Sequence, residues 1–320
     1  MIAASATLCQ NTNRRMRPSW PVWPVEAVAT TMLCASIILP MTPPVLLAVT
    51  IRTGLNPSCC AVIFCRLPKS TFELEDQSWF PAVIRDLATD YLQFIQTGSR
   101  IDRAMTPVVR RALEKSGATR IVDLCSGGSG PLLLLVKDLA AAGIPIKATL
   151  TDLYPNEDAF TQISARSGGL IDFEPLPVDA RHVPPHLPGL RTIFNGFHHF
   201  RPSDARSVLH AAASARQPIA IFEVSERSLR TLPVVLTPLF VWLVTPFMRP
   251  FVWRRLFWTY VLPMVPLTCF WDGIVSQLRA YTPAELREMC AGADPMTWEI
   301  GQIPIAKGRG RLTYLIGFPT

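Results

Sequence analysis

The sequence predicts an α/β protein built on a doubly wound, mostly parallel sheet. Three observations predict this class: helix and strand patterns alternate, a glycine-rich turn follows the first strand pattern, and the chain closes on a hairpin pattern. We expect seven strands, of which the last two are antiparallel. The expected strands are residues 120–124, 146–150, 174–178, 192–197, 219–224, 297–305 and 311–318.

The helices of this fold are predicted from the spacing of apolar residues and from end signals. Apolar residues recur at three- and four-residue intervals from Phe72 to Phe94, as in an amphipathic helix. Further helices are expected at 107–115, 131–142, 202–215 and 272–290. Within the last of these, Thr282 and Glu285 form a capping-box pattern around a proline, which predicts that a new helix begins there.

Composition narrows the classes of function. Hydrophobic residues make up 49% of the 320-residue chain and charged residues only 17%, so part of it is more apolar than an ordinary enzyme. The net charge of +7 suits an anionic partner, but no basic patch interleaved with aromatic residues indicates nucleic-acid binding. A membrane surface is therefore the favoured anionic partner.

Cysteine and histidine usage argues against disulfides and metal sites. The eight cysteines are irregularly spaced, and no Cys-x-x-Cys pair or matching histidine spacing indicates a zinc site. We expect reduced thiols, no metal ion and a cytoplasmic protein that is either free or associated with a membrane.

Residues 1–70 differ from the rest, because they are rich in proline and cysteine and contain Glu26 as their only acid. Three interpretations remain open for this N-terminal extension. It is a signal-anchor with Arg14, Arg15 and Arg17 before an apolar run, an Arg-rich transit peptide, or a poorly ordered extension upstream of the true start. The folded domain is expected to occupy residues 72–320.

A candidate ligand site follows the first two strands. Asp123 ends the first strand, and the turn after it contains Cys125, Ser126, Gly127, Gly128 and Gly130, which allow the backbone to approach a ligand closely. The second strand leads to Asp152, whose carboxylate can accept hydrogen bonds from both hydroxyls of a ribose. A structural turn and a capping Asp are the alternatives for these two features.

These residues resemble the first motif of class I S-adenosylmethionine-dependent methyltransferases, which have a Rossmann-like fold. The resemblance covers residues 72–320, and the closing hairpin matches the reversed last strand of that fold. It differs at Cys125 and Ser129, where the family often has glycine.

The resemblance implies S-adenosyl-L-methionine as the cofactor and assigns residues to it. Asp123 would orient the loop toward the methionine amino group, Asp152 would hold the ribose, and Asp179 would meet the adenine amine. Their neighbours Leu153 and Ala180 are placed in the same site.

The end of the fourth strand supplies the catalytic candidates. His198 and His199 lie at the carboxyl edge of the sheet, where ligands bind in such folds, and either imidazole is a candidate base. Glu223, which ends the fifth strand, is a weaker catalytic candidate. Asn195 contacts the cofactor or satisfies the backbone. The alternative for the histidine pair is structural packing beside aromatic residues.

Residues 232–271 form an apolar insertion without a single acid. Its halves are interrupted by prolines and are shorter than the roughly 20 residues that cross a bilayer. Tryptophans mixed with Arg249, Arg254 and Arg255 favour an interfacial hairpin that admits a lipid-like acceptor. The alternatives are a lid over the site and the face of a homodimer. Trp271 and Asp272 are candidates for lining the acceptor pocket.

The leading hypothesis is thus a methyltransferase acting on a small or lipophilic acceptor, with no nucleic-acid partner. The alternative is a catalytically degenerate, membrane-associated binding or scaffold protein that keeps the fold. A nucleotide-dependent oxidoreductase is a third class, against which the closing hairpin argues.

Overall fold

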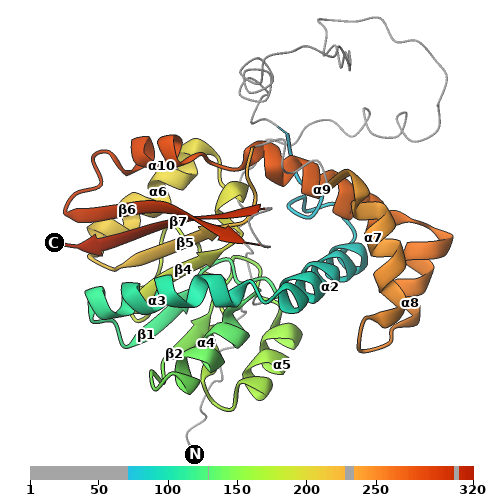
Figure 1. The fold of residues 1–320 in the computed structure, drawn as a ribbon, viewed down its shortest axis with the longest axis horizontal. Coiled ribbons are helices and arrows are strands. Elements are labelled where there is room, and N and C mark those ends of the chain that lie inside the picture. Colours follow the sequence, from blue (N-terminus) through green and yellow to red (C-terminus); the bar gives the residue numbers. More distant parts are fainter. Residues whose placement is uncertain (1–70, 129, 228–233, 306–309) are drawn as a thin grey trace, which may run out of the picture. The chain divides into compact units, whose positions relative to one another are not determined.

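A computed structural model describes residues 71–320 except for residues 129, 228–233 and 306–309. The predicted N-terminal extension lies outside these residues. Figure 1 shows the α/β fold with its helices on both faces of one sheet.

The sheet has seven strands in the order β3-β2-β1-β4-β5-β7-β6. The first five strands pair in parallel, whereas β7 is antiparallel to both β5 and β6. This arrangement confirms the predicted Rossmann-like, mostly parallel sheet with a closing antiparallel hairpin. The strands are β1 (Arg120–Asp123), β2 (Lys147–Leu150), β3 (Ile171–Phe173), β4 (Leu190–Phe194), β5 (Ile219–Glu223), β6 (Met296–Ile305) and β7 (Gly310–Pro319).

The parallel strands are buried on both faces because neighbouring side chains point in opposite directions. Ile121 packs with α3 (Asp102–Ser116), α4 (Leu132–Ala141) and α5 (Glu157–Ser167). Its neighbour Val122 packs with α6 (Pro202–Ser214) and α10 (Pro283–Cys290) on the other face. The capping box predicted at Thr282 is present, with both of its hydrogen bonds, at the start of α10.

Between β5 and α10 the chain forms helices that add no strand to the sheet. They are α7 (Thr237–Val244), η4 (Thr245–Phe247), α8 (Trp253–Leu256), η5 (Phe257–Val261) and α9 (Met264–Arg279). Together with α2 (Ala82–Ser99) they enclose a third apolar cluster, to which Tyr91, Val241 and Val265 belong.

No single helix among the described residues has the length and apolar composition of a membrane span. Only the bent pair Trp253–Val261 and Met264–Arg279, which meet at 75°, passes that test as a unit.

Two sequence predictions about elements are wrong, and one helix was not predicted. The helix expected from Phe72 begins only at Ala82, because Pro81 stands before its first residue and residues 72–80 form turns. The strand expected at 174–178 is β3, three residues earlier. Helix α5 was not predicted, because its apolar residues are few and its exposed face is polar.

Smaller shifts affect the fourth strand and the last helices. Strand β4 ends at Phe194, so Asn195 follows the strand instead of belonging to it. The helical stretch expected at 272–290 contains the end of one helix and, as the capping box predicted, the start of another, because Ala280 leaves the helical conformation before Thr282 caps α10.

Candidate functional site

The glycine-rich loop after β1 has an open backbone. Gly127 has a φ of +48°, and a Cβ built there would meet nothing within 4 Å. Gly128 and Gly130 instead face α2, where an added Cβ would lie 3.2 Å from Thr89 and 3.1 Å from Gln96. Close packing therefore disfavours a larger side chain at Gly128 and Gly130, whereas Gly127 leaves space for a ligand beside the backbone.

Asp123 holds this loop from beneath. Its carboxylate accepts hydrogen bonds from the Thr192 hydroxyl at 2.6 Å and the Ser126 hydroxyl at 2.7 Å, and its carbonyl oxygen accepts one from the Thr151 amide at 2.9 Å. Burial raises the pKa of Asp123 to about 7, although the two hydroxyl hydrogen bonds act in the opposite direction. This network is consistent with the predicted role of Asp123 in orienting the loop. Because Asp123 is only 2% exposed, its contact with a methionine amino group stays a prediction.

Asp152 lies directly against the loop. Its carboxylate accepts hydrogen bonds from the backbone amides of Gly127 and Tyr154, both at 2.9 Å, and no ion pair links it to a cation within the described residues. Its neighbour Leu153 is 42% exposed. The Asp152 carbonyl also accepts a hydrogen bond from Val178, which brings the segment before Asp179 to the same edge.

Asp179, the predicted adenine contact, is engaged by its own loop. Its carboxylate pairs with the Arg181 guanidinium at 2.7 Å, and Arg181 also reaches Asp204. Ala180 is buried among the residues that cover the sheet. The contact with adenine therefore remains a prediction for both residues.

Cys125 and Asn195 both have a positive φ, of 56° and 54°, which is uncommon for residues other than glycine. The Asn195 side-chain oxygen accepts a hydrogen bond from the Val224 amide at 3.1 Å, so it joins the ends of β4 and β5. This is the backbone-satisfying alternative considered for Asn195. Burial, followed by the charges of Asp152 and Asp123, raises the pKa of Cys125 well above its ordinary value, so its thiol stays protonated.

The histidine pair lies on η2 (Phe197–His199), just beyond β4. His198 is 2% exposed, and its Nδ1 lies 2.6 Å from a carboxylate oxygen of Glu223. The other Glu223 oxygen accepts a hydrogen bond from the Phe197 amide at 2.6 Å. Glu223 therefore orients the His198 ring, and the sequence prediction correctly placed both at one edge.

His199 faces a group of acids that the sequence analysis did not identify. Its Nδ1 lies 2.9 Å from Asp76 and 3.3 Å from Glu73, and its Nε2 lies 4.0 Å from Glu75. Burial lowers the pKa of His199, but the charges of Glu73 and Asp76 outweigh that effect and raise the pKa to about 10. The free protein therefore carries an imidazolium here, and His199 alone is not a base at neutral pH.

Two residues of α9 fix the segment that carries these acids. Asp272 accepts hydrogen bonds from the backbone amides of Leu74 at 2.6 Å and Glu75 at 3.2 Å. The Trp271 indole donates to the Phe72 carbonyl at 3.0 Å. Trp271 and Asp272 thus position the acidic segment, which differs from their expected role in lining an acceptor pocket.

The buried side of His198 offers little space. The cavity beside it, lined by Arg279 and Tyr281, has a volume of about 10 Å³, enough for roughly one water molecule. The His199 side chain is 26% exposed, so the histidine pair is open to solvent on that side.

Sequence reasoning missed Glu73, Glu75, Asp76 and Arg279. The three acids precede α2 within the stretch expected to be helical, so their apolar neighbours hid their role. The one available signal was the concentration of acids at residues 73–76, next to a turn-forming stretch.

Comparisons with known proteins give weak matches to methyltransferases. No family model and no curated protein matches the chain. An O-methyltransferase structure from Nostoc punctiforme PCC 73102 matches at 12% identity and a TM-score of 0.45, over 81% of this chain and 66% of that chain.

Two further structures are similar at the same level. Mitomycin 7-O-methyltransferase matches at 14% identity and a TM-score of 0.38, over 64% of this chain and 50% of its own. The methyltransferase domain of bacterial CtHen1-C matches at 12% identity and a TM-score of 0.41, over 67% of this chain and 96% of its own. The chain thus spans less than two thirds of the first two, and the fold assignment rests on its strand order and register.

The raised pKa of Asp123 predicts a pH-dependent stability. In the unfolded chain this carboxyl has a pKa of about 3.9, so the stability that it contributes is complete below about pH 4 and is lost as the pH rises through about 7. Asp123→Asn cannot titrate and lacks this loss. From pH 4.5 to 7.5 the unfolding free energy of the wild type should fall relative to the variant by at least about 1.4 kcal/mol, equivalent to one pKa unit.

Urea denaturation at a series of pH values measures this difference. The exposed Asp158 supplies the control, since Asp158→Asn should give a curve parallel to that of the wild type. If the curve of unfolding free energy against pH for Asp123→Asn were also parallel to that of the wild type, the pKa of Asp123 would not be raised by burial.

Proposed function

We propose that the chain is an S-adenosylmethionine-dependent methyltransferase that acts on a small or lipophilic acceptor. The observation that carries the proposal is the convergence of the open glycine loop, Asp152 and the histidine pair at the carboxyl ends of β1, β2 and β4. Ligands bind at this edge in doubly wound sheets. The antiparallel β7 is consistent with the resemblance to methyltransferases and not with a dehydrogenase.

The residues present fit the cofactor in shape and charge. Gly127 leaves space beside its backbone, and Asp152 has lone pairs available beyond the two backbone amides that it accepts. S-adenosylmethionine supplies a methyl group on a positively charged sulfonium. A loop bordered by Asp123 and Asp152 suits a ligand that carries a sulfonium and an ammonium group.

The polar side of the acceptor site is assigned to the histidine pair. Methyl transfer to a protic acceptor needs an oriented nucleophile and a route for its proton. His199 is the imidazole that an acceptor can reach, while Glu223 fixes the His198 ring behind it. The three catalytic candidates His198, His199 and Glu223 therefore act as a unit at this edge.

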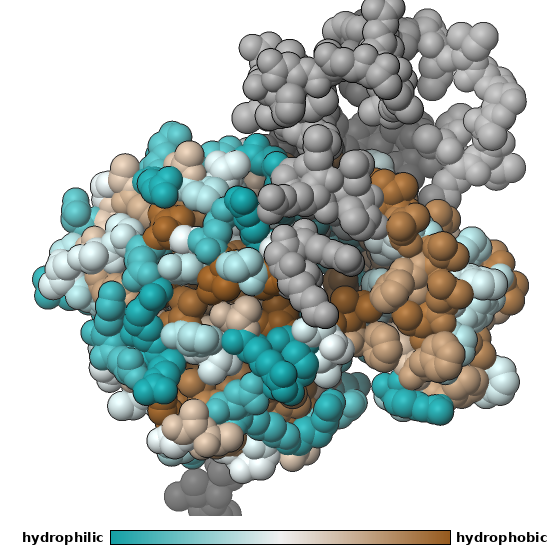
Figure 2. Space-filling view, viewed as in Figure 1, coloured by the Kyte–Doolittle hydropathy of each residue, from teal (hydrophilic) through white to brown (hydrophobic). Residues whose placement is uncertain are grey.

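The lipophilic nature of the acceptor is inferred from the surface of the segment between β5 and α9. Figure 2 shows hydrophobic residues gathered on the side formed by α7 and α8. Large apolar patches of this kind mark interaction sites, and exposed Arg249 and Arg254 beside them suit an anionic membrane surface. The exposed apolar side chains include Leu236, Leu239, Phe240, Trp242, Leu243, Phe247, Phe251, Trp253, Val261 and Leu262.

Arg255 does not belong to this surface, contrary to the sequence interpretation. Its guanidinium is 4% exposed, pairs with Asp90 at 2.7 Å, and donates to the Pro250 carbonyl. It therefore holds α8 against α2 and cannot reach a lipid headgroup.

Asp152→Ala is expected to weaken cofactor binding by at least about tenfold, because a lost pair of hydrogen bonds to a charged group corresponds to 1.5 kcal/mol or more. Calorimetric titration of the full chain with S-adenosylmethionine measures the change. Asp158→Ala, the same substitution on the surface of α5, should bind as the wild type does. Unchanged binding by Asp152→Ala would remove the ribose assignment, and no binding by the wild type would leave the scaffold alternative.

His199→Ala is expected to keep cofactor binding within about threefold and to lower methyl transfer by about tenfold or more, because the variant lacks a charged hydrogen-bond donor, worth about 1.5 kcal/mol or more, that would orient the acceptor. The readout is the transfer of labelled methyl from S-adenosylmethionine into a lipid and small-molecule extract of the host cells. His210→Ala, on α6, is the matched control. Full transfer by His199→Ala would exclude that residue from the acceptor site.

The double variant Phe247→Ser and Trp253→Ser should reduce partitioning onto vesicles that contain phosphatidylserine by about tenfold or more, since both side chains are more than 70% exposed on the apolar surface. Sedimentation with vesicles measures the bound fraction. Leu176→Ser removes an apolar side chain that is 68% exposed elsewhere and should leave partitioning unchanged. Equal partitioning of the double variant and the wild type onto the vesicles would contradict a membrane role for this surface. It would leave the two alternatives, a lid over the site and the face of a homodimer.

A further inference from the structure

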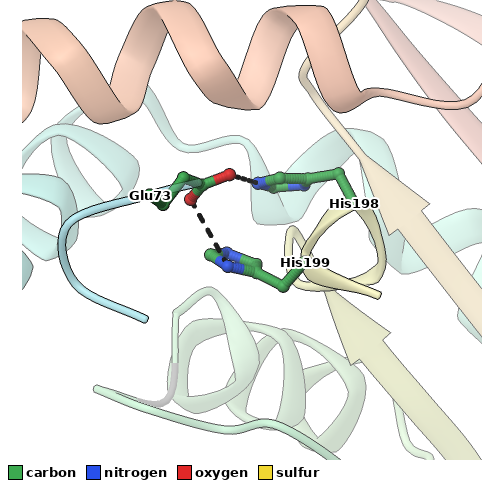
Figure 3. A group of neighbouring side chains, drawn as sticks. All are labelled: Glu73, His198 and His199. Carbon is green, nitrogen blue, oxygen red and sulfur yellow. Dashed lines mark ion pairs between the residues drawn. The ribbon is translucent and has the colours of Figure 1, made fainter. Parts of the chain in front are cut away.

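Three potential metal ligands converge at the edge of the acceptor site. One ligand atom from each of Glu73, His198 and His199 lies within 4.8 Å of the others. Figure 3 shows the carboxylate of Glu73 beside the two imidazole rings, with one oxygen directed to each ring. The oxygens lie 3.8 Å from Nε2 of His198 and 3.3 Å from Nδ1 of His199.

The Glu73 carboxylate is buried without hydrogen bonds. Its residue is 0% exposed, and neither oxygen accepts a hydrogen bond from any residue that the structure describes. Burying a carboxylate in this way is costly unless a cation or donors compensate for the lost water. The 3.8 Å separation from His198 is too long for a hydrogen bond but spans two ligands of one ion.

His198 is oriented as metal-binding histidines usually are. Glu223 occupies Nδ1 at 2.6 Å, which leaves Nε2 as the nitrogen that faces Glu73. A carboxylate on the outer nitrogen fixes the ring and increases its basicity as a ligand. Glu223 therefore has the position of an outer-shell partner.

The charges around the pair also favour a cation. The carboxylates of Glu73, Glu75, Asp76 and Glu223 lie within 4.0 Å of the two histidines. The neighbouring Arg279 guanidinium lies 3.7 Å from Glu73 and 3.3 Å from Asp76, and it also donates to the His199 carbonyl. The Arg279 guanidinium and the His199 imidazolium together still leave an excess of negative charge over the four carboxylates. A divalent ion that displaces the proton of His199 would reduce this excess.

We propose that Glu73, His198 and His199 bind a divalent transition-metal ion of the zinc type. Two histidines and one carboxylate are a ligand set that binds zinc while leaving a position open. The widest separation in the group has to shrink when the ion binds, and rotation of His199, the most exposed of the three, allows this. An acceptor oxygen at the open position would be polarised by the ion, which gives the ion a role in the proposed reaction. The metal site itself does not depend on that reaction.

Zinc titration of the full chain, after treatment with EDTA and desalting, tests the proposal without cofactor or acceptor. The wild type is expected to bind one equivalent of zinc. The isosteric variant Glu73→Gln should bind that equivalent at least about 100-fold more weakly, which exceeds the roughly 10–100-fold loss typical when a residue outside the ligand group is changed. Zinc held by cysteines elsewhere in the chain is unaffected by this substitution, so the difference between the two proteins isolates the site.

Glu157→Gln is the matched control, because it makes the same change at an exposed acid on α5, outside the ligand group and its neighbouring charges. It should bind zinc within about threefold of the wild type, and zinc should raise the melting temperature of the wild type and Glu157→Gln but not of Glu73→Gln. Wild-type-like binding by Glu73→Gln, or no zinc-dependent rise in the wild type, overturns the proposal. Cofactor binding is measured in a separate titration. A negative zinc result therefore contradicts the metal site without contradicting the methyltransferase proposal, and a negative cofactor result does the opposite.

Discussion

The carboxylate of Asp272 connects the two unusual parts of this molecule. It lies on α9, at the end of the apolar segment, yet its hydrogen bonds go to the backbone amides of Leu74 and Glu75. Burial raises the pKa of Asp272 to about 7, because it disfavours the charged carboxylate. The hydrogen bonds from the Leu74 and Glu75 amides offset part of this desolvation cost. They act together with the Trp271 indole, which donates to the Phe72 carbonyl, and with Arg85, which donates to the Glu75 carbonyl.

This attachment makes the acceptor side of the site dependent on the apolar segment. The acids Glu73 and Asp76 reach the histidines only because α9 holds their backbone, whereas His198 is fixed from the sheet by Glu223. One half of the site is therefore rigidly mounted on strands β4 and β5. The other half is attached to α9, whose helical neighbours carry the exposed apolar surface.

The sheet could be predicted from sequence because it depends on local patterns. Strand β1, the loop after it and the closing hairpin follow from apolar runs and glycine positions, and these identified Asp123 and Asp152. The elements that failed were decided by tertiary contacts: polar α5 gains stability from packing Phe160 and Ile163, and residues 72–80 are drawn out of a helix by Trp271, Asp272 and Pro81. Apolar spacing alone carries no signal of such partners.

The same reason explains why half of the site was missed. His198, His199 and Glu223 end neighbouring strands, so topology alone brought them together. Glu73 is distant in sequence from both histidines, and its apolar neighbours Phe72 and Leu74 made it resemble a solvent-facing residue of an amphipathic helix. Only the fold shows that its carboxylate is buried beside the two imidazoles.

Charge is distributed unevenly over the molecule, in a way that the net value conceals. The chain is basic overall, with a net charge of +7, but the carboxyl edge of its sheet collects Asp152 and the acids around His199. A negative edge in a basic protein disfavours anionic ligands and attracts cations, through charges that are too close and too buried to be screened by salt. A sulfonium cofactor at one end of this edge and a divalent ion at the other would both neutralise charge that folding has concentrated there.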